Sequence, residues 1–317
     1  MTSRVHGVHH VTAIAADPQE NLDFWVGALG LRLVKRSVNQ DAPDTYHLFY
    51  ADGGGTPGTD VTFFPWPSMH PARDGAGQAR EVALAVPVGS LEWWEERLSG
   101  AGVDAGPAET RFGETLLPFR DPHGLSLALV ETDDERAWVP WEGSPVGAER
   151  QIRGVHAVRM AVRELGPTGA LLEEVLGFEP VDEEDGWRRF AAGGGGSGRW
   201  LDVVERPGEP HGGWGTGAVH HVAWRVADDR EQADLRERLL EAGHEPTPVI
   251  DRFWFRSVYF REPGGVLFEL ATAGPGFERD EPREALGGRL ILPPWLEEKR
   301  DRIEAVLPPL TPPARGR

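Results

Sequence analysis

The chain has 317 residues, of which 39% are hydrophobic and 26% charged, enough sequence for about two globular domains. Its formal net charge of −18 disfavours binding to nucleic acid or to anionic membrane surfaces. The chain has no cysteine, which excludes thiol catalysis, zinc–thiolate sites and disulfides. It also lacks any run of about 20 apolar residues, so we expect a soluble, cytoplasmic protein.

One short pattern opens four segments of the chain and indicates an internal repeat. Residues 8–14 and 219–224 both contain Val-His-His-Val. Residues 155–160 contain Val-His-Ala-Val, and residues 80–86 carry a fainter version. Each segment is typical of a buried strand.

Each predicted strand is followed by further elements in the same order. Amphipathic patterns typical of helices lie at residues 21–29, 91–101, 166–176 and 232–242. Extended segments then return, as at residues 45–51, 59–64, 187–192 and 200–205. The repeat is therefore a strand, a helix and two or three more strands, present four times. We expect an α+β protein with curved mixed sheets and helices outside them.

The repeats predict the domain organisation. We expect modules one and two to form an N-terminal domain at 1–136, followed by a Pro- and Gly-containing linker at 137–152. Modules three and four would form a C-terminal domain at 153–272. The remaining tail, 273–317, is rich in proline and charge and contains one short predicted helix near 296–306.

The two His-His pairs, His9-His10 and His220-His221, occupy equivalent repeat positions. Adjacent strand residues point to opposite faces of a sheet, so one imidazole of each pair faces the concave side. A single strand histidine is most often a core residue. Two pairs at equivalent positions favour a functional site.

Glu269 lies in an otherwise apolar predicted strand. A buried carboxylate costs several kcal/mol unless it is paired or bound to a metal. Its repeat counterpart is Ala128, so the fold itself does not require a carboxylate there. An ion pair with Arg252 or Arg256 is the structural alternative.

Two imidazoles and one carboxylate form the ligand set of non-haem Fe(II) oxygenases, which leave coordination positions open for substrate and dioxygen. The same donors also suit zinc, nickel or manganese. Ligand type alone therefore leaves the metal open.

These features resemble the vicinal oxygen chelate superfamily, which includes glyoxalase I, bleomycin-resistance proteins and type I extradiol dioxygenases. The resemblance implies four βαβββ modules, paired into two domains whose curved sheets form metal-binding cups. It is closer to the hydroquinone-type ring-cleaving dioxygenases, such as chlorohydroquinone 1,2-dioxygenase. The segments that carry it are residues 33–36, 46–48, 55–59, 63–65, 251–252, 255–265 and 292–295.

The resemblance implies that iron is bound by His10, His221 and Glu269. Catechol-type relatives take their first ligand from the start of module three, where this chain has Ala157, which cannot bind a metal. Modules one and four must then cooperate across the domain divide.

Four further residues match positions near the iron of the hydroquinone-type enzymes. His9 and His220 would orient ligands or substrate, Tyr259 would contact a substrate hydroxyl or pass a proton, and Arg252 would hold an anionic intermediate. Ordinary packing is the alternative for His9 and Tyr259.

The resemblance therefore implies an Fe(II)-dependent dioxygenase that opens a hydroxylated aromatic ring with both atoms of dioxygen. Hydroquinones are the first expected substrates and catechols the second, and Mn(II) could replace Fe(II). One alternative is a glyoxalase-like isomerase, in which Glu81 could serve as a second metal-bound carboxylate. Another is a ligand-sequestering protein that needs no metal. Self-association is left open.

Overall fold

The computed structural model describes residues 4–133 and 135–311. Within these ranges the chain contains four successive βαβββ modules, and the first is typical of them. Module one consists of β1 (Val8–Ala15), α1 (Pro18–Leu22) continued by a wider helical turn at Asp23–Ala28, β2 (Arg32–Val38), β3 (Tyr46–Ala51) and β4 (Asp60–Pro65).

The other three modules repeat this order of elements. Module two consists of β5 (Gln78–Val86), α2 (Leu91–Gly100), β6 (Glu109–Arg111), β7 (Glu114–Arg120) and β8 (Ser126–Glu131). Module three consists of β9 (Gly154–Val162), α3 (Leu165–Ala170) continued by the turn Leu171–Leu176, β10 (Glu179–Glu184), β11 (Trp187–Ala191) and β12 (Trp200–Glu205). Module four consists of β13 (Val219–Val226), α4 (Asp229–Glu241), β14 (Ile250–Asp251), β15 (Arg256–Arg261) and β16 (Leu267–Thr272).

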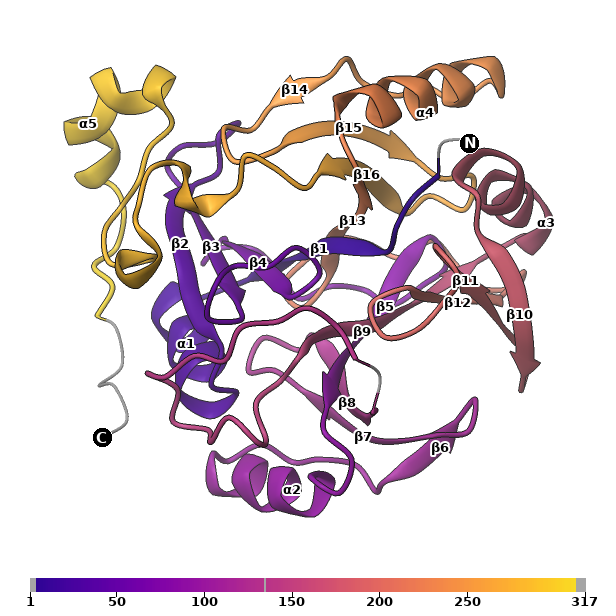
Figure 1. The fold of residues 1–317 in the computed structure, drawn as a ribbon, viewed down its shortest axis with the longest axis horizontal. Helices are drawn as coiled ribbons and strands as arrows, with labels where there is room; N and C mark the ends of the chain where they lie inside the picture. The colour runs from indigo at the N-terminus through magenta and orange to yellow at the C-terminus, as the bar shows by residue number, and fades with distance from the viewer. Residues whose placement is uncertain (1–3, 134, 312–317) are drawn as a thin grey trace.

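The strands of the described residues form two eight-stranded mixed sheets. One sheet has the order β14-β15-β16-β13-β1-β4-β3-β2 and joins module four to module one. The other has the order β10-β11-β12-β9-β5-β8-β7-β6 and joins module three to module two. Figure 1 shows α1, α2, α3 and α4 at the periphery and the first strands of the modules near the centre. The α+β class, the curved mixed sheets and the outer helices are therefore confirmed.

The sheets do not follow the division into 1–136 and 153–272. Each sheet takes one module from each half of the chain, because the first strands pair antiparallel as β1 with β13 and β5 with β9. The expected cooperation of modules one and four is thus the pairing within a single sheet. The assignment of the two halves as domains, with 137–152 as linker, stays a prediction.

Helix boundaries follow from local capping. The side chain of Asp17 accepts hydrogen bonds from the backbone N–H groups of Gln19 and Glu20, both at 2.8 Å, and fixes the start of α1. Asp228 caps α4 in the same way, so that helix begins earlier than the predicted 232. Gly177, with φ of +76°, ends the helical segment of module three in a left-handed conformation.

The tail packs against module one and supports one wall of the first sheet. Pro294–Lys299 and α5 (Arg300–Glu304) form the predicted helical segment. Lys35 on β2 is fully buried, contacts Glu281, and lies 2.7 Å from Asp280 Oδ1. Phe277 packs edge-on against Phe49, with ring centroids 5.2 Å apart. Within residues 4–133 and 135–311, no helix has the length and apolar character of a membrane span.

The two lysines of this chain provide a matched test of this docking. Replacing Lys35 with Ala leaves the buried carboxylate of Glu281 without its nearest cation, so we expect a loss of about 3–5 kcal/mol in the free energy of unfolding. Lys299 is exposed, and Lys299→Ala should change that energy by less than about 0.5 kcal/mol. Urea unfolding measures both, and equal effects of the two substitutions would contradict a buried ionic anchor for the tail.

Candidate metal centre

Three side chains from three neighbouring strands converge on one point. His10 Nε2 lies 3.1 Å from His221 Nε2, and Glu269 Oε2 lies 3.0 Å from His221 Nε2 and 3.4 Å from His10 Nε2. Their candidate donor atoms all lie within 4.8 Å of one another, and all three residues are buried. The structure thus brings together the three residues expected to bind a metal.

Strand register explains this convergence. His10 on β1 is paired with Ala223 on β13, and Ala223 is paired with Glu269 on β16. His221 precedes Ala223 by two residues and therefore points to the same face. Because Ala223 carries only a methyl group, space remains between the three longer side chains.

The donor set fits a divalent metal ion. Glu269 is fully buried, and its Oε2 has no hydrogen-bond donor among the described residues, although two imidazole nitrogens surround it. Burial raises the pKa of this carboxyl, but the adjacent imidazoles of His10 and His221 outweigh that effect and hold it well below its usual range. An ionised carboxylate beside two imidazoles offers the ligands typical of Fe(II) and Mn(II).

A hydrogen bond with His9 determines which ring nitrogen of His10 carries the proton. Its Nε2 lies 3.1 Å from the carbonyl oxygen of Thr272, which can only accept, so this nitrogen carries the proton. His9 Nδ1 then accepts a hydrogen bond from His10 Nδ1 at 2.9 Å. The proton of His10 is therefore on Nδ1, and its Nε2 is available to a metal.

His220 has the same relation to His221. Their Nδ1 atoms lie 2.8 Å apart, which leaves His221 Nε2 facing the cluster. The His220 ring stacks on Trp214, with centroids 4.4 Å apart. Burial lowers the pKa of both His9 and His220 to about 3, so both rings are neutral near pH 7.

Tyr259 and Arg252 lie beside the cluster, but neither contacts Glu269 as an ion pair. Tyr259 is paired with Glu269 across β15 and β16, and its ring meets that of His221 edge-on at 5.6 Å. The Arg252 guanidinium lies 5.3 Å from the Tyr259 ring centroid and pairs with Asp41 at 2.8 Å. Burial raises the pKa of the Tyr259 hydroxyl, which therefore stays protonated. Arg256 pairs with Asp229, so neither arginine forms an ion pair with Glu269, and the ion-pair alternative for Glu269 is wrong.

A small cavity of about 40 Å³ adjoins the candidate ligands. It has room for only a few water molecules. Its walls are mainly aromatic and also include Arg252 and the segment 39–41. The aromatic and imidazole residues that line it are His10, His47, Phe49, Phe64, His221, Trp254, Phe255 and Tyr259. Of the aromatic run 253–255, the second and third residues therefore reach the cavity.

Sequence reasoning missed two hydroxyl groups of this site. Ser257 Oγ donates to Glu269 Oε1 at 2.5 Å. Thr62 lies at the position of β4 that corresponds to Glu269, and its hydroxyl lies 2.9 Å from His47 Nε2 and 2.7 Å from Thr12 Oγ1. A small hydroxyl in a strand gives no sequence signal, because only pairing across strands reveals its partner.

Glu81, considered as a second carboxylate ligand, lies elsewhere. It is on β5 in the other sheet and accepts a hydrogen bond from Arg111 at 2.5 Å. Among the described residues, the sheet that holds His10 thus places Thr62, not a carboxylate, opposite Glu269. Glu81, named as a second metal-bound carboxylate under the isomerase alternative, is therefore not part of this cluster.

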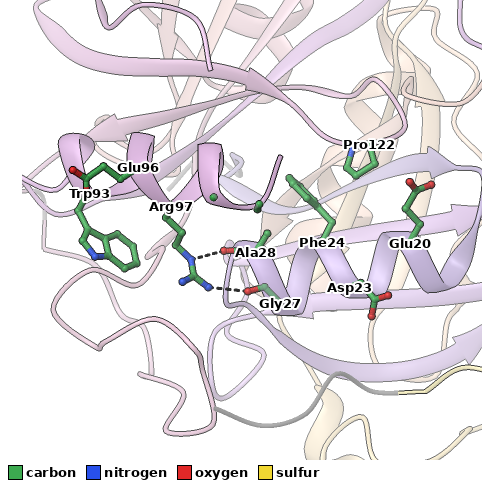
Figure 2. A pocket seen from close by; sticks show the side chains of 11 residues that line it. Glu20, Asp23, Phe24, Gly27, Ala28, Trp93, Glu96, Arg97 and Pro122 are labelled. Carbon is green, nitrogen blue, oxygen red and sulfur yellow. Dashed lines mark hydrogen bonds between the residues drawn. The ribbon is translucent and has the colours of Figure 1, made fainter. Parts of the chain in front are cut away.

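A larger hollow lies between the first two helical segments. It has a volume of about 760 Å³, and Phe24, Trp93 and Arg97 line it. Figure 2 shows the Arg97 side chain directed at the backbone of Gly27 and Ala28, to whose carbonyl groups it donates at 2.8 and 2.7 Å. None of the candidate metal ligands lines it.

Removing one candidate ligand tests the centre. His221→Ala should abolish stoichiometric metal binding, because two ligands of the three cannot hold the ion in place. His156→Ala is a matched control, since His156 is also buried and lies on β9 in the other sheet. Metal content after dialysis against Fe(II) under anaerobic conditions measures both. Full metal content in His221→Ala would remove His221 from the ligand set.

The neutral histidines also predict how acid affects the metal-free protein. His9 has a pKa of about 3 in the folded chain and about 6.5 when unfolded, so between these values the unfolded chain binds the extra proton. The free energy of unfolding therefore falls as pH is lowered through this window. His9→Gln should reduce this dependence by up to about 1.4 kcal/mol per pH unit, whereas exposed His70→Gln should not. Urea unfolding at pH 7 and pH 5 measures the difference, and identical slopes would contradict it.

Comparison with known proteins places this site in a family. Residues 7–129 and 154–270 match the model of the Glyoxalase/Bleomycin resistance protein/Dioxygenase superfamily. The chain is 41% identical to the "Putative ring-cleaving dioxygenase MhqO" of Bacillus subtilis, over 98% of both proteins. It is 35% identical to the chlorohydroquinone/hydroquinone 1,2-dioxygenase of Sphingobium indicum, over 96% of both.

Solved structures agree with this assignment. A crystal structure described as a dioxygenase from Bacillus subtilis is 41% identical and superposes with a TM-score of 0.92, over 98% of this chain and 99% of that one. Glyoxalase I from Zea mays, 14% identical, shares the fold with a TM-score of 0.63 over 84% of this chain and 92% of that one. The buried His-His-Glu cluster and these full-length matches lead to one conclusion: the chain belongs to the Glyoxalase/Bleomycin resistance protein/Dioxygenase superfamily.

Proposed function

We propose that the protein is an Fe(II)-dependent ring-cleaving dioxygenase that acts on hydroquinone-type aromatics, with catechols as second candidates. The observation that carries the proposal is the buried cluster of His10, His221 and Glu269, whose two histidines line an aromatic-walled cavity. The full-length similarity to a hydroquinone 1,2-dioxygenase supports the same substrate class. Both atoms of dioxygen would enter the ring-opened product.

His10, His221 and Glu269 would hold the metal, which could also be Mn(II). When bound, the ion would supply the one-electron chemistry that allows dioxygen to react with a phenol. The hydrogen bond from His10 to His9 keeps the ligating nitrogen of His10 unprotonated, and His220 would act in the same way on His221. These second imidazoles therefore hold the ligands in the orientation that a metal requires.

The remaining polar groups suit a phenolic substrate. Tyr259, with its raised pKa, would donate a hydrogen bond to a substrate oxygen. Arg252 would hold an anionic oxygen, because its guanidinium stays charged. The walls formed by Phe49, Phe64 and Phe255 exclude water and match the apolar faces of an aromatic ring.

The cavity must widen to admit a ring, since its volume is about 40 Å³. The exposed partner of Arg252 is Asp41, whose side chain is 74% accessible. Gln40 Nε2 also bonds the carbonyl oxygen of Arg252 at 2.9 Å. We place the entrance to the cavity at residues 39–41, because the contacts of this segment with Arg252 lie near solvent.

The glyoxalase-like alternative has less support. Proton abstraction next to a carbonyl requires a base, and the carboxylate considered for that role, Glu81, is paired with Arg111 in the other sheet. A ligand-sequestering protein would not need the buried carboxylate of Glu269 beside two imidazoles.

Oxygen uptake tests the proposal. Protein reconstituted with Fe(II) under anaerobic conditions should consume dioxygen when given hydroquinone or chlorohydroquinone, and should consume less with catechol. A new absorbing, ring-opened product should appear at the same rate. The His221→Ala variant, treated identically, is the control for free iron. Metal-loaded protein that takes up no dioxygen with any of the three substrates would contradict the assignment and favour an isomerase.

A further inference from the structure

The two oxygens of the Glu269 carboxylate lie in different surroundings. Oε1 accepts a hydrogen bond from Ser257 Oγ at 2.5 Å. Oε2 faces the Nε2 atoms of His221 and His10 and has no hydrogen-bond donor among residues 4–133 and 135–311. One oxygen is therefore fixed by the protein, and the other is presented to the proposed metal.

Strand pairing places the Ser257 hydroxyl beside the Glu269 carboxylate. Ser257 lies on β15, paired with Ala271 of β16, and Glu269 is two residues before Ala271 on the same face. Both Ser257 and Glu269 are fully buried, so water does not compete for either group. An ionised carboxylate can only accept, which makes the hydroxyl the donor.

The other half of the same sheet lacks this arrangement. At the corresponding positions β3 carries His47 and β4 carries Thr62, and their side chains bond each other at 2.9 Å. Within the described residues of this sheet, a hydroxyl donor to a buried carboxylate thus occurs in the half that bears the candidate ligand. The Ser257–Glu269 hydrogen bond therefore accompanies the candidate metal ligand Glu269 and is not a feature shared by the repeated modules.

We propose that Ser257 is a positioning residue of the metal centre, whose hydroxyl holds Oε1 and turns Oε2 toward the two imidazoles. The proposal rests on the proposed metal-binding function. The terminal torsion of a glutamate is broad, so an unsupported carboxylate would sample orientations that do not bind the ion. Partners of this kind, which bond a ligand and not the metal, typically change metal affinity about 10–100-fold.

Three substitutions of Ser257 isolate the hydroxyl. Ser257→Ala and Ser257→Val remove it, and Ser257→Thr keeps it in a side chain of almost the same shape as Val. Ser37→Ala is a matched control, because Ser37 is also fully buried in this sheet and its Oγ has no hydrogen-bond partner in the described part of the chain. Co(II) is the probe, since its visible absorption reports the ligand geometry.

Titration of each metal-free variant with Co(II) should give one site in the parent protein. Ser257→Ala and Ser257→Val should bind Co(II) about 10–100-fold more weakly and with an altered absorption spectrum. Ser257→Thr and Ser37→Ala should stay close to the parent in both readouts. Circular dichroism establishes that each variant is folded, and the Thr and Val variants decide the question if the Ala variant is not.

Parent-like affinity and spectrum in the variants without a hydroxyl would overturn the role of Ser257 and leave the metal centre intact. Equal weakening in the Thr and Val variants would assign the effect to side-chain shape and would also overturn the role. A parent protein that binds no Co(II), Mn(II) or Fe(II) would instead overturn the proposed function, and the role of Ser257 with it.

Discussion

The antiparallel pairing of β1 with β13 is the contact on which the site depends. It joins strands that are more than 200 residues apart and brings the imidazoles of His10 and His221 to within 3.1 Å. Contacts of such long sequence separation require a large loss of chain entropy, which the buried faces of both sheets offset. The candidate ligands are therefore in place only when modules one and four have formed a common sheet.

The buried carboxylate of Glu269 links the stability of that sheet to the binding of a cation. A fully buried carboxylate is unfavourable unless charge and hydrogen bonds surround it, and here two imidazoles and Ser257 do so. Their arrangement leaves one oxygen without a donor among the described residues. The same geometry that would make this sheet less stable when empty makes it suitable for a divalent cation.

The second sheet shows how the same repeat can serve stability. At the start of β5 and β9 it carries Glu81 and Ala157 where the first sheet carries its histidines. Arg189 pairs there with Asp202 at 2.8 Å, and Glu81 pairs with Arg111. Ion pairs thus occupy the second sheet, whereas a cavity and a candidate metal centre occupy the first. The two sheets share one backbone arrangement, and a few different side chains decide whether it holds ion pairs or a candidate metal centre.

The sequence by itself determined the modules and the residue types of the site. Strand alternation, helical periodicity and capping residues are local properties, so the βαβββ order and the elements could be predicted, apart from boundaries such as the start of α4. The free-energy cost of burying a carboxylate in an apolar strand also identified Glu269 as a candidate functional residue from sequence alone. Only the tertiary structure decided that each sheet takes one module from each half, that Glu81 pairs with Arg111, and that Ser257 bonds Glu269. These outcomes depend on strand pairing and on side-chain geometry between distant segments, and no local pattern in the chain encodes them.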